Sequence, residues 1–102
     1  MPTMPSDPGS DERFEHDAAA HRFTLAFGTA VAVLDYREHD ARTLEYYHTF
    51  VPPPMRGRGV ASRLVAHALR YALERRLTVI PTCPFVAAFV RRHPEYAPVP
   101  HR

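Results

Sequence analysis

The sequence predicts an α+β domain in which three antiparallel strands are followed by a helix, a short strand and a second helix. Apolar and polar residues alternate over much of residues 22–51, as they do in strands that bury one face. From Val60 onward the apolar residues recur with helical spacing, and a second helical pattern covers residues 85–92. The apolar run at residues 77–81 lies between these patterns and suits a short buried strand. The predicted order is therefore β-β-β-α-β-α.

Turn signals divide the first half of this domain into its strands. Residues 23–27 and 30–36 flank Gly28 and Thr29, which predicts a hairpin, and the polar residues 37–42 predict the next turn. The third strand covers residues 43–51, and its alternation predicts two faces, one with Leu44, Tyr46, His48 and Phe50 and the other with Glu45, Tyr47 and Thr49. The three prolines that follow lack N–H donors, so this strand must end before them.

The first 20 residues differ in composition from the rest of the chain. They are rich in proline, serine and acidic residues and offer little to bury, so we expect a disordered tail at residues 1–20 and a single domain at residues 21–102. No apolar run reaches the ~18 residues that a membrane helix needs, and no secretory signal is evident. A cytoplasmic location is the resulting expectation, and the single cysteine, Cys83, cannot form an intrachain disulfide.

Charge is distributed unevenly between the two halves of the chain. Residues 1–50 hold four arginines and nine acidic residues, whereas residues 51–102 hold nine arginines and two acidic residues. The C-terminal half should therefore attract anions. All 13 basic residues are arginine, which favours multidentate contacts with phosphates and excludes catalysis by a lysine amine.

A loop with two glycines lies between the third predicted strand and the first predicted helix. A strand that leads through such a loop into a helix N-terminus makes an anion site, because unpaired N–H groups and the helix dipole point the same way. Gly57 and Gly59 allow a phosphate to approach the backbone, and Arg56 and Arg58 add positive charge. A loop that only shapes a turn into an amphipathic helix is the alternative that these residues leave open.

The loop also carries a resemblance to a known family. Arg56, Gly59 and Ala61 match the pyrophosphate-binding signature of GNAT acetyltransferases, Gln/Arg-x-x-Gly-x-Gly/Ala. The segment lacks the Gly-Lys-Ser/Thr of a P-loop and the Gly-x-Gly-x-x-Gly of a dinucleotide-binding unit. Similarity to a compact, single-domain GNAT subgroup continues at residues 48–49, 83–86 and 93–96. The resemblance covers residues 22–99.

This resemblance implies a GNAT-like mixed sheet with a V-shaped splay between the third and fourth predicted strands, and an acetyl-CoA-dependent N-acetyltransferase. The pantetheine of acetyl-CoA would lie in the V, and a backbone amide near Phe50 or Val51 could face the thioester carbonyl. The residues expected to contact the coenzyme are Phe50, Val51, Arg56, Gly57, Arg58, Gly59, Val60, Ala61 and Ser62. The amine acceptor stays unidentified, because the chain lacks the front helices that usually build the acceptor pocket of GNATs.

Two residues are candidates for the acyl-transfer chemistry. His48 lies on the strand expected to border the thioester and could accept the amine proton, with a structural histidine as the alternative. Cys83 lies at the open side of the V, where a thiolate could take the acyl group, although we expect direct transfer past a buried thiol. Glu45 is the reserve base. Tyr96 could substitute for the usual GNAT tyrosine acid, because the comparable stretch at residues 90–92 holds no tyrosine, and the alternative is an aromatic side chain that only packs at the sheet edge.

Two other functions remain compatible with these residues. A non-catalytic acyl-CoA-binding or sensor module would keep the loop and the V but would need no base or acid. A nucleic-acid-binding domain would account for the arginine-rich C-terminal half, but no aromatic platform or helix-turn-helix pattern accompanies it. The seven histidines lack metal-ligand spacing, so no metal site is expected.

Overall fold

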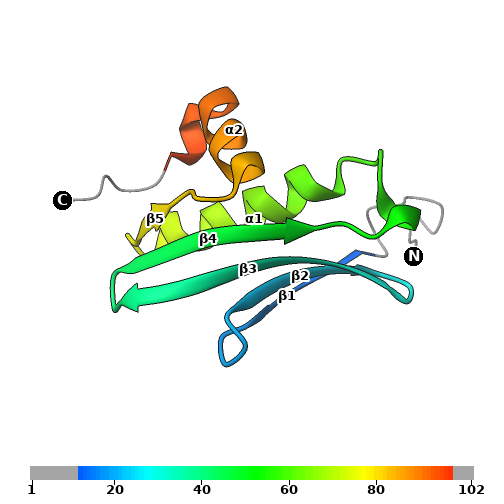
Figure 1. Cartoon of the computed structure of the whole chain (residues 1–102), viewed down its shortest axis with the longest axis horizontal. Helices are drawn as coiled ribbons and strands as arrows, with labels where there is room; N and C mark the ends of the chain where they lie inside the picture. Colours follow the sequence, from blue (N-terminus) through cyan, green and yellow to red (C-terminus); the bar gives the residue numbers. More distant parts are fainter. Residues whose placement is uncertain (1–11, 98–102) are drawn as a thin grey trace, which may run out of the picture.

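The fold is a five-stranded sheet with two helices packed on one of its faces (Figure 1). The computed structural model describes residues 12–97. The strands lie in the order β1-β2-β3-β4-β5, and all neighbours are antiparallel except β4 and β5, which are parallel. The predicted α+β class and the order from the hairpin onward are confirmed, with one additional strand at the start.

The additional strand is β1 (Glu12–Asp17), which pairs antiparallel with β2 (Arg22–Phe27). Its Phe14 side chain stacks on His67 of the main helix, with ring centroids 4.6 Å apart. The expectation of a disordered tail at residues 1–20 is therefore wrong for this strand. Its composition suggests little burial, but a neighbouring strand pairs with its backbone and the helix packs against its aromatic side chains. The part of the predicted tail before β1 lies outside the described residues.

The predicted hairpin is formed by β2 and β3 (Ala30–Asp40), around Gly28 with a φ of 63°. Strand β3 is longer than predicted, because Arg37, Glu38 and Asp40, expected in a turn, pair with the start of β4 (Thr43–Phe50). The turn contains only residues 41–42. Cross-strand pairing has therefore overridden the polar composition of this stretch.

A bulge at Tyr47 changes which side chains of β4 share a face. Two adjacent residues of β3 pair with Tyr46 and His48, which leaves Tyr47 as the extra residue. Beyond the bulge Thr49 pairs with the buried Leu34 and faces the helices, whereas His48 lies on the opposite face of the sheet. The predicted faces are therefore wrong beyond Tyr46, because one extra residue inverts the alternation.

The main helix, α1 (Val60–Glu74), packs across β2 and β3 and buries one face in the core. Its predicted apolar stripe is buried, namely Val60, Leu64, Val65, Ala68, Leu69 and Ala72. Burial of a side chain such as Leu64 is worth about 1.5–3 kcal/mol. The buried Tyr46 hydroxyl donates a hydrogen bond to the Ala68 carbonyl at 2.6 Å and so fastens β4 to α1. Burial raises the pKa of Tyr46, which keeps this donor protonated.

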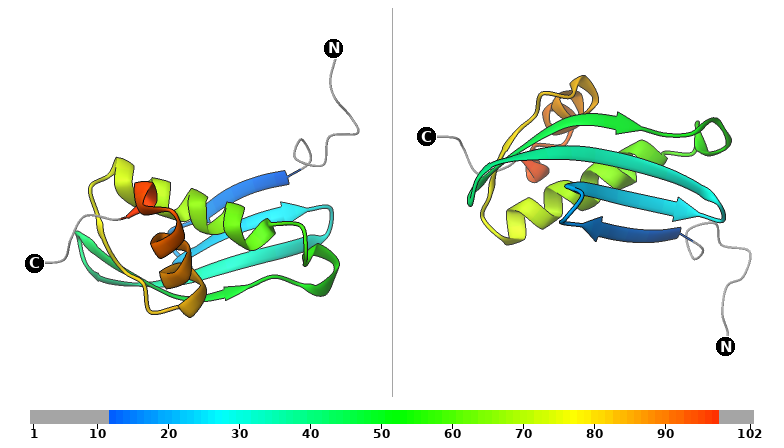
Figure 2. Two further views of the ribbon diagram at one scale, coloured as in Figure 1. Left: turned by 90° about the horizontal axis from the view of Figure 1, so that it is seen from above. Right: turned by 60° about the horizontal axis from the view of Figure 1, so that its bottom comes forward.

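The C-terminal part of the fold consists of β5 (Thr78–Ile80) and α2 (Pro84–Arg92), followed by the short turn η3 (Pro94–Tyr96). Figure 2 shows α1 and α2 on the same side of the sheet. Among the described residues no helix covers the other face, which we call the uncovered face. Neither α1 nor α2 combines the length and apolar character needed to cross a membrane, as far as the described chain extends.

Candidate functional site

The loop between β4 and α1 consists of a 3-10 turn and two glycines. The turn η2 (Pro53–Met55) closes with the Arg56 N–H, which donates to the Pro53 carbonyl at 3.1 Å. Gly57 and Gly59 then have φ values of 80° and 72°, in the left-handed region that residues with a Cβ disfavour. These glycines let the chain reverse from the end of β4 into α1 within a few residues (Figure 1).

The N-terminus of α1 is uncapped. Gly59 is the N-cap residue and provides no side-chain hydrogen bond, and the first turn holds no acidic residue. The first helical bond runs from the Arg63 N–H to the Gly59 carbonyl at 3.1 Å. The N–H groups of Val60, Ala61 and Ser62 therefore have no acceptor within residues 12–97. Three free donors at the positive end of a helix dipole can bind an anion.

A hollow of about 250 Å³, which we call the loop groove, opens beside these donors. It is lined by Val51, Met55, Arg56, Gly57, Gly59, Val60, Ala61, Ser62 and Phe85. Every residue predicted to contact a coenzyme lines it, except Phe50 and Arg58. Phe85 was missed by the sequence reasoning. It belongs to the first turn of α2 and comes beside the loop only through tertiary packing.

Arg56 ties the loop to the end of β4. Its Nε donates to the Val51 carbonyl at 2.8 Å, and its guanidinium carbon lies 5.9 Å from the centre of the Phe50 ring. Phe50 is 45% exposed and lies on the uncovered face, opposite Val33 of β3. The charge of Arg56 therefore stays beside the loop groove while its side chain fixes the geometry of the loop.

Arg58 lies on the other side of the loop. Arg58 lines a separate cavity of about 650 Å³, together with Glu12 and Arg63. Arg63 Nη1 donates to the Arg58 carbonyl at 2.8 Å, and the Arg63 guanidinium also forms an ion pair with Glu12 of β1. Arg58 therefore belongs to the loop by its backbone but does not line the loop groove.

Strands β4 and β5 pair over three residues and then part, as the predicted splay requires. The last strand pair is Glu45 with Ile80, and beyond it the Cys83 N–H donates to the Tyr46 carbonyl at 3.0 Å. The chain then enters α2, whereas β4 continues to Phe50 with no strand on that side within the described residues. The apex of the V therefore lies at Cys83.

The Cys83 side chain lies on the helix-covered side of this apex. It is buried, with 6% of its surface exposed, and its sulfur is 3.6 Å from Thr49 Oγ1. Thr49 can reach the thiol because the bulge at Tyr47 turns its side chain toward the helices. The sequence reasoning missed this contact, since simple alternation placed Thr49 on the other face.

His48 lies on the opposite side of β4 from the thiol of Cys83. Its imidazole is on the uncovered face, opposite Asp35 of β3, and is exposed. It has no side-chain hydrogen bond or ring contact with any other described residue. The two predicted catalytic side chains therefore lie on opposite faces of the sheet.

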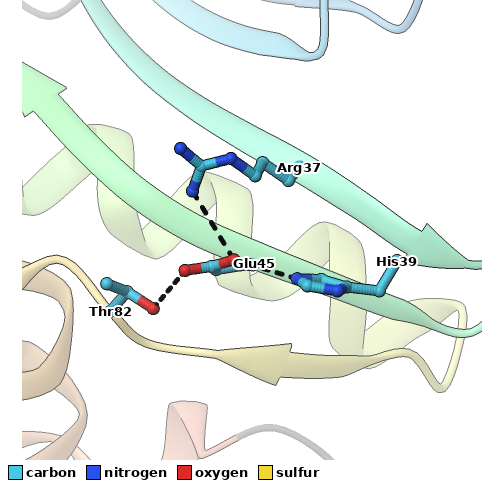
Figure 3. Close-up of polar contacts among 4 residues, drawn as sticks. All are labelled: Arg37, His39, Glu45 and Thr82. Carbon is cyan, nitrogen blue, oxygen red and sulfur yellow. Dashed lines mark hydrogen bonds and ion pairs between the residues drawn. The ribbon is translucent and has the colours of Figure 1, made fainter.

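Glu45 also lies on the uncovered face, within a cluster of donors (Figure 3). Its Oε2 accepts a hydrogen bond from Thr82 Oγ1 at 2.6 Å, and its Oε1 lies 2.9 Å from His39 Nε2 and 3.6 Å from Arg37 Nη1. Hydrogen bonds from Thr82 first and His39 second hold the pKa of Glu45 below its ordinary value. Both oxygens are engaged, so this carboxylate is a poor proton acceptor and fits the reserve-base hypothesis badly.

Tyr96, the predicted substitute acid, packs against the two helices. Its hydroxyl accepts a hydrogen bond from Arg70 Nη2 at 3.2 Å, and its ring lies 5.4 Å from the Phe89 ring. Neither neighbour lines the loop groove. The structure therefore supports the packing alternative for this tyrosine.

Known proteins share both the sequence and the fold. Residues 22–99 match the family described as GCN5-related N-acetyl-transferase. Protein NATD1 of Xenopus tropicalis is 33% identical over 86% of this chain and 83% of its own length. Protein NATD1 of Homo sapiens is 32% identical over 92% of this chain and 85% of its own.

A solved structure shares the arrangement of strands and helices described above. It is the NMR solution structure of a GCN5-like putative N-acetyltransferase from Staphylococcus aureus, which superimposes with a TM-score of 0.68 over 88% of both chains. At 24% identity this likeness shows a common fold. Together with the sequence match over residues 22–99, it shows that the chain belongs to the GCN5-related N-acetyltransferase (GNAT) family.

Proposed function

We propose that this protein is an N-acetyltransferase that moves an acetyl group from acetyl-CoA to an amine. The observation that carries the proposal is the uncapped N-terminus of α1, which presents free N–H donors to the loop groove at the end of β4. Family membership supports a transferase of this kind. We place the protein in the cytoplasm, because a single free cysteine suits a reducing compartment.

The pyrophosphate of acetyl-CoA would bind at the start of α1. The N–H groups of Val60, Ala61 and Ser62 would donate to its oxygens, and Arg56 would add positive charge from the rim of the groove. Each hydrogen bond to a charged group of this kind is worth about 1.5–3 kcal/mol. The pantetheine would then follow β4 back from Val51 toward the bulge, along the side where this strand has no neighbouring strand in the described chain.

The acetyl group would thereby reach the apex of the V. There the amine attacks the thioester carbonyl, the C–N bond forms, and the C–S bond breaks as coenzyme A leaves as a thiolate that takes up a proton. The bulge at Tyr47 lies at this point, and a backbone N–H of β4 beside it would donate to the developing oxyanion. Cys83 would form a wall of the acetyl pocket, with transfer direct rather than through the thiol.

The acceptor amine would approach from the uncovered face of the sheet. His48 is exposed on that face, one residue beyond the bulge, and would accept the amine proton. Because no helix of the described chain covers this face, an amine on a large molecule could reach it without a narrow channel.

A second candidate function is an acyl-CoA-binding module without catalysis. One observation favours it. Among the described residues, no acidic or basic side chain contacts the Cys83 thiol on the helix-covered side of the apex. Such a module would bind acetyl-CoA in the same groove. Only a measurement of turnover separates it from the enzyme.

Calorimetric titration with acetyl-CoA tests the common part of both functions. We expect a Kd in the micromolar range for the natural sequence. Gly59→Val should abolish binding, because a Cβ at a φ of 72° would lie 3.3 Å from Arg63 Nη1 and its methyl groups would crowd the free donors. Unchanged affinity in a folded Gly59→Val variant would show that the loop groove is not the coenzyme site.

Release of free coenzyme A in the presence of a panel of amines tests the enzyme itself. Turnover with at least one amine supports the acetyltransferase, whereas binding without turnover across the panel supports the sensor module. A single-stranded oligonucleotide serves as the control ligand. Tight oligonucleotide binding without acetyl-CoA binding would replace both proposals with the nucleic-acid-binding alternative.

A further inference from the structure

The Glu45 carboxylate links three segments at the place where β4 and β5 part (Figure 3). Oε2 accepts the hydrogen bond from Thr82 Oγ1 at 2.6 Å, in the segment that follows β5. Oε1 faces His39 at 2.9 Å and Arg37 at 3.6 Å, both on β3. The Glu45 side chain is 16% exposed, and its carboxylate contacts all three partners near the surface. One side chain therefore joins β4 to both of its neighbours.

Thr82 depends on this link because the strand ladder has already ended. The last pair of β4 and β5 is Glu45 with Ile80, and Pro81 has no N–H to continue the ladder. The Thr82 N–H turns back to the Ile80 carbonyl at 3.0 Å instead of reaching β4. Within residues 12–97, the hydroxyl bond to Glu45 is the polar contact that joins Thr82 to β4.

Cys83 is the next residue, and its position depends on the same backbone. Its N–H donates to the Tyr46 carbonyl at 3.0 Å, and its sulfur lies 3.6 Å from Thr49 Oγ1 on the helix-covered side. Thr82 is thus held on one face of the sheet and Cys83 on the other. Loss of the Glu45–Thr82 bond would free the segment that closes the apex of the V.

We propose that Glu45 is a positioning residue that acts through Thr82 to hold Cys83 and the apex of the V in place. The consequence for catalysis rests on the proposed acetyltransferase function, because the apex is where that proposal puts the acetyl group. The carboxylate has no role as a base in this scheme, since its oxygens already accept from Thr82 and face His39.

Two substitutions distinguish positioning from base catalysis. Thr82→Val removes the hydroxyl but keeps the shape of the side chain, and Glu45→Leu removes both carboxylate oxygens, so Thr82 loses its acceptor. A positioning role predicts similar effects for both variants, because each breaks the same link. A base at Glu45 predicts that Glu45→Leu abolishes turnover whereas Thr82→Val leaves it intact.

The first readout is the alkylation rate of Cys83 by iodoacetamide, which needs no enzymatic activity. Cys83 is the only cysteine of the chain and is buried, so its alkylation reports local opening of the apex. We expect alkylation roughly fivefold faster in both variants, as the loss of one hydrogen bond allows. The matched control is Thr24→Val, on the same face of the sheet, whose hydroxyl has no hydrogen-bond partner among the described residues. It should alkylate at the natural rate.

The second readout compares coenzyme binding, which depends on the pyrophosphate end, with turnover, which depends on the acetyl end. The acetyl-CoA Kd should stay within about twofold in Thr82→Val and Glu45→Leu, because the free donors lie at the far end of β4. The kcat for coenzyme A release should fall by about tenfold or more, since a small displacement of the reacting groups is costly. Unchanged alkylation in both variants would overturn the proposal. If the natural protein shows no turnover, the proposed function fails, while alkylation still decides whether Glu45 positions Cys83.

Discussion

Replacing Gly57 with alanine should separate coenzyme binding from stability. Gly57 and Gly28 have φ values of 80° and 63°, and a Cβ at either position would meet no other atom within 4 Å. The left-handed conformation costs an alanine about 1–2 kcal/mol, and the stiffer unfolded chain recovers about 0.4–1 kcal/mol. Both variants should therefore lose on the order of 0.5–1 kcal/mol of stability and melt a few degrees lower.

Coenzyme affinity should differ between these two variants although their strain is similar. Gly57 lines the loop groove, where a methyl group would stand in the way of a pyrophosphate, whereas Gly28 lies in the hairpin between β2 and β3. We expect Gly57→Ala to raise the acetyl-CoA Kd by roughly tenfold or more, about 1.4 kcal/mol. Gly28→Ala should leave the Kd within about twofold.

Thermal melts and calorimetric titration of both variants provide the test. Equal melting temperatures would show that the two variants have similar backbone strain. A difference in Kd would then be due to the methyl group in the loop groove. The same Kd for Gly57→Ala and Gly28→Ala would refute the placement of the pyrophosphate on the glycine loop. Coenzyme binding would in that case have to be sought elsewhere on the chain.

Three further predictions concern the strand β1, acid stability and the thiol. Deletion of the chain through Asp17 should lower the melting temperature by several degrees, because it removes β1 and the stacking of Phe14 on α1; an unchanged melt would show that β1 adds nothing to stability. Burial lowers the pKa of His16 and His67 below 6.5, so the unfolded chain binds more protons than the folded protein and the free energy of unfolding should fall as the pH drops below about 6.5. Urea melts at pH 7.5 and 5.5 test this, and His67→Gln should reduce the difference in unfolding free energy between the two pH values. Cys83→Ser should lower turnover only modestly if transfer is direct, whereas a hydrolysable acetyl adduct on the thiol in intact-mass spectra, formed as fast as turnover, would contradict direct transfer.

The elements of the domain could be predicted from local patterns. The alternation around Leu25 and Leu34 follows from one buried face of a strand, and both side chains are in the core. The helical stripe beginning at Val60 gives α1 with the predicted start. The loop residues Arg56 to Ser62 could be picked out because glycines before a helix N-terminus have a local signature, and most of them line one groove.

The faces of β4 could not be predicted from the same kind of pattern. The bulge at Tyr47 depends on how β4 pairs with β3, and the alternation of residue types does not predict it. For this reason Thr49 was expected on the wrong face, and its contact with Cys83 was missed. The position of His48 on the uncovered face follows from the same extra residue.

Local patterns were sufficient to predict the order of strands and helices from the hairpin onward, the place where the third predicted strand must stop, and the loop before the N-terminus of α1, because each depends on residues that are neighbours along the chain. The strand at Glu12–Asp17, the position of Phe85 beside the loop groove, and the bond between Glu45 and Thr82 became apparent only in the folded protein. These features arise from pairing and packing between segments distant in sequence, whose energies exceed the local preferences of the residues involved.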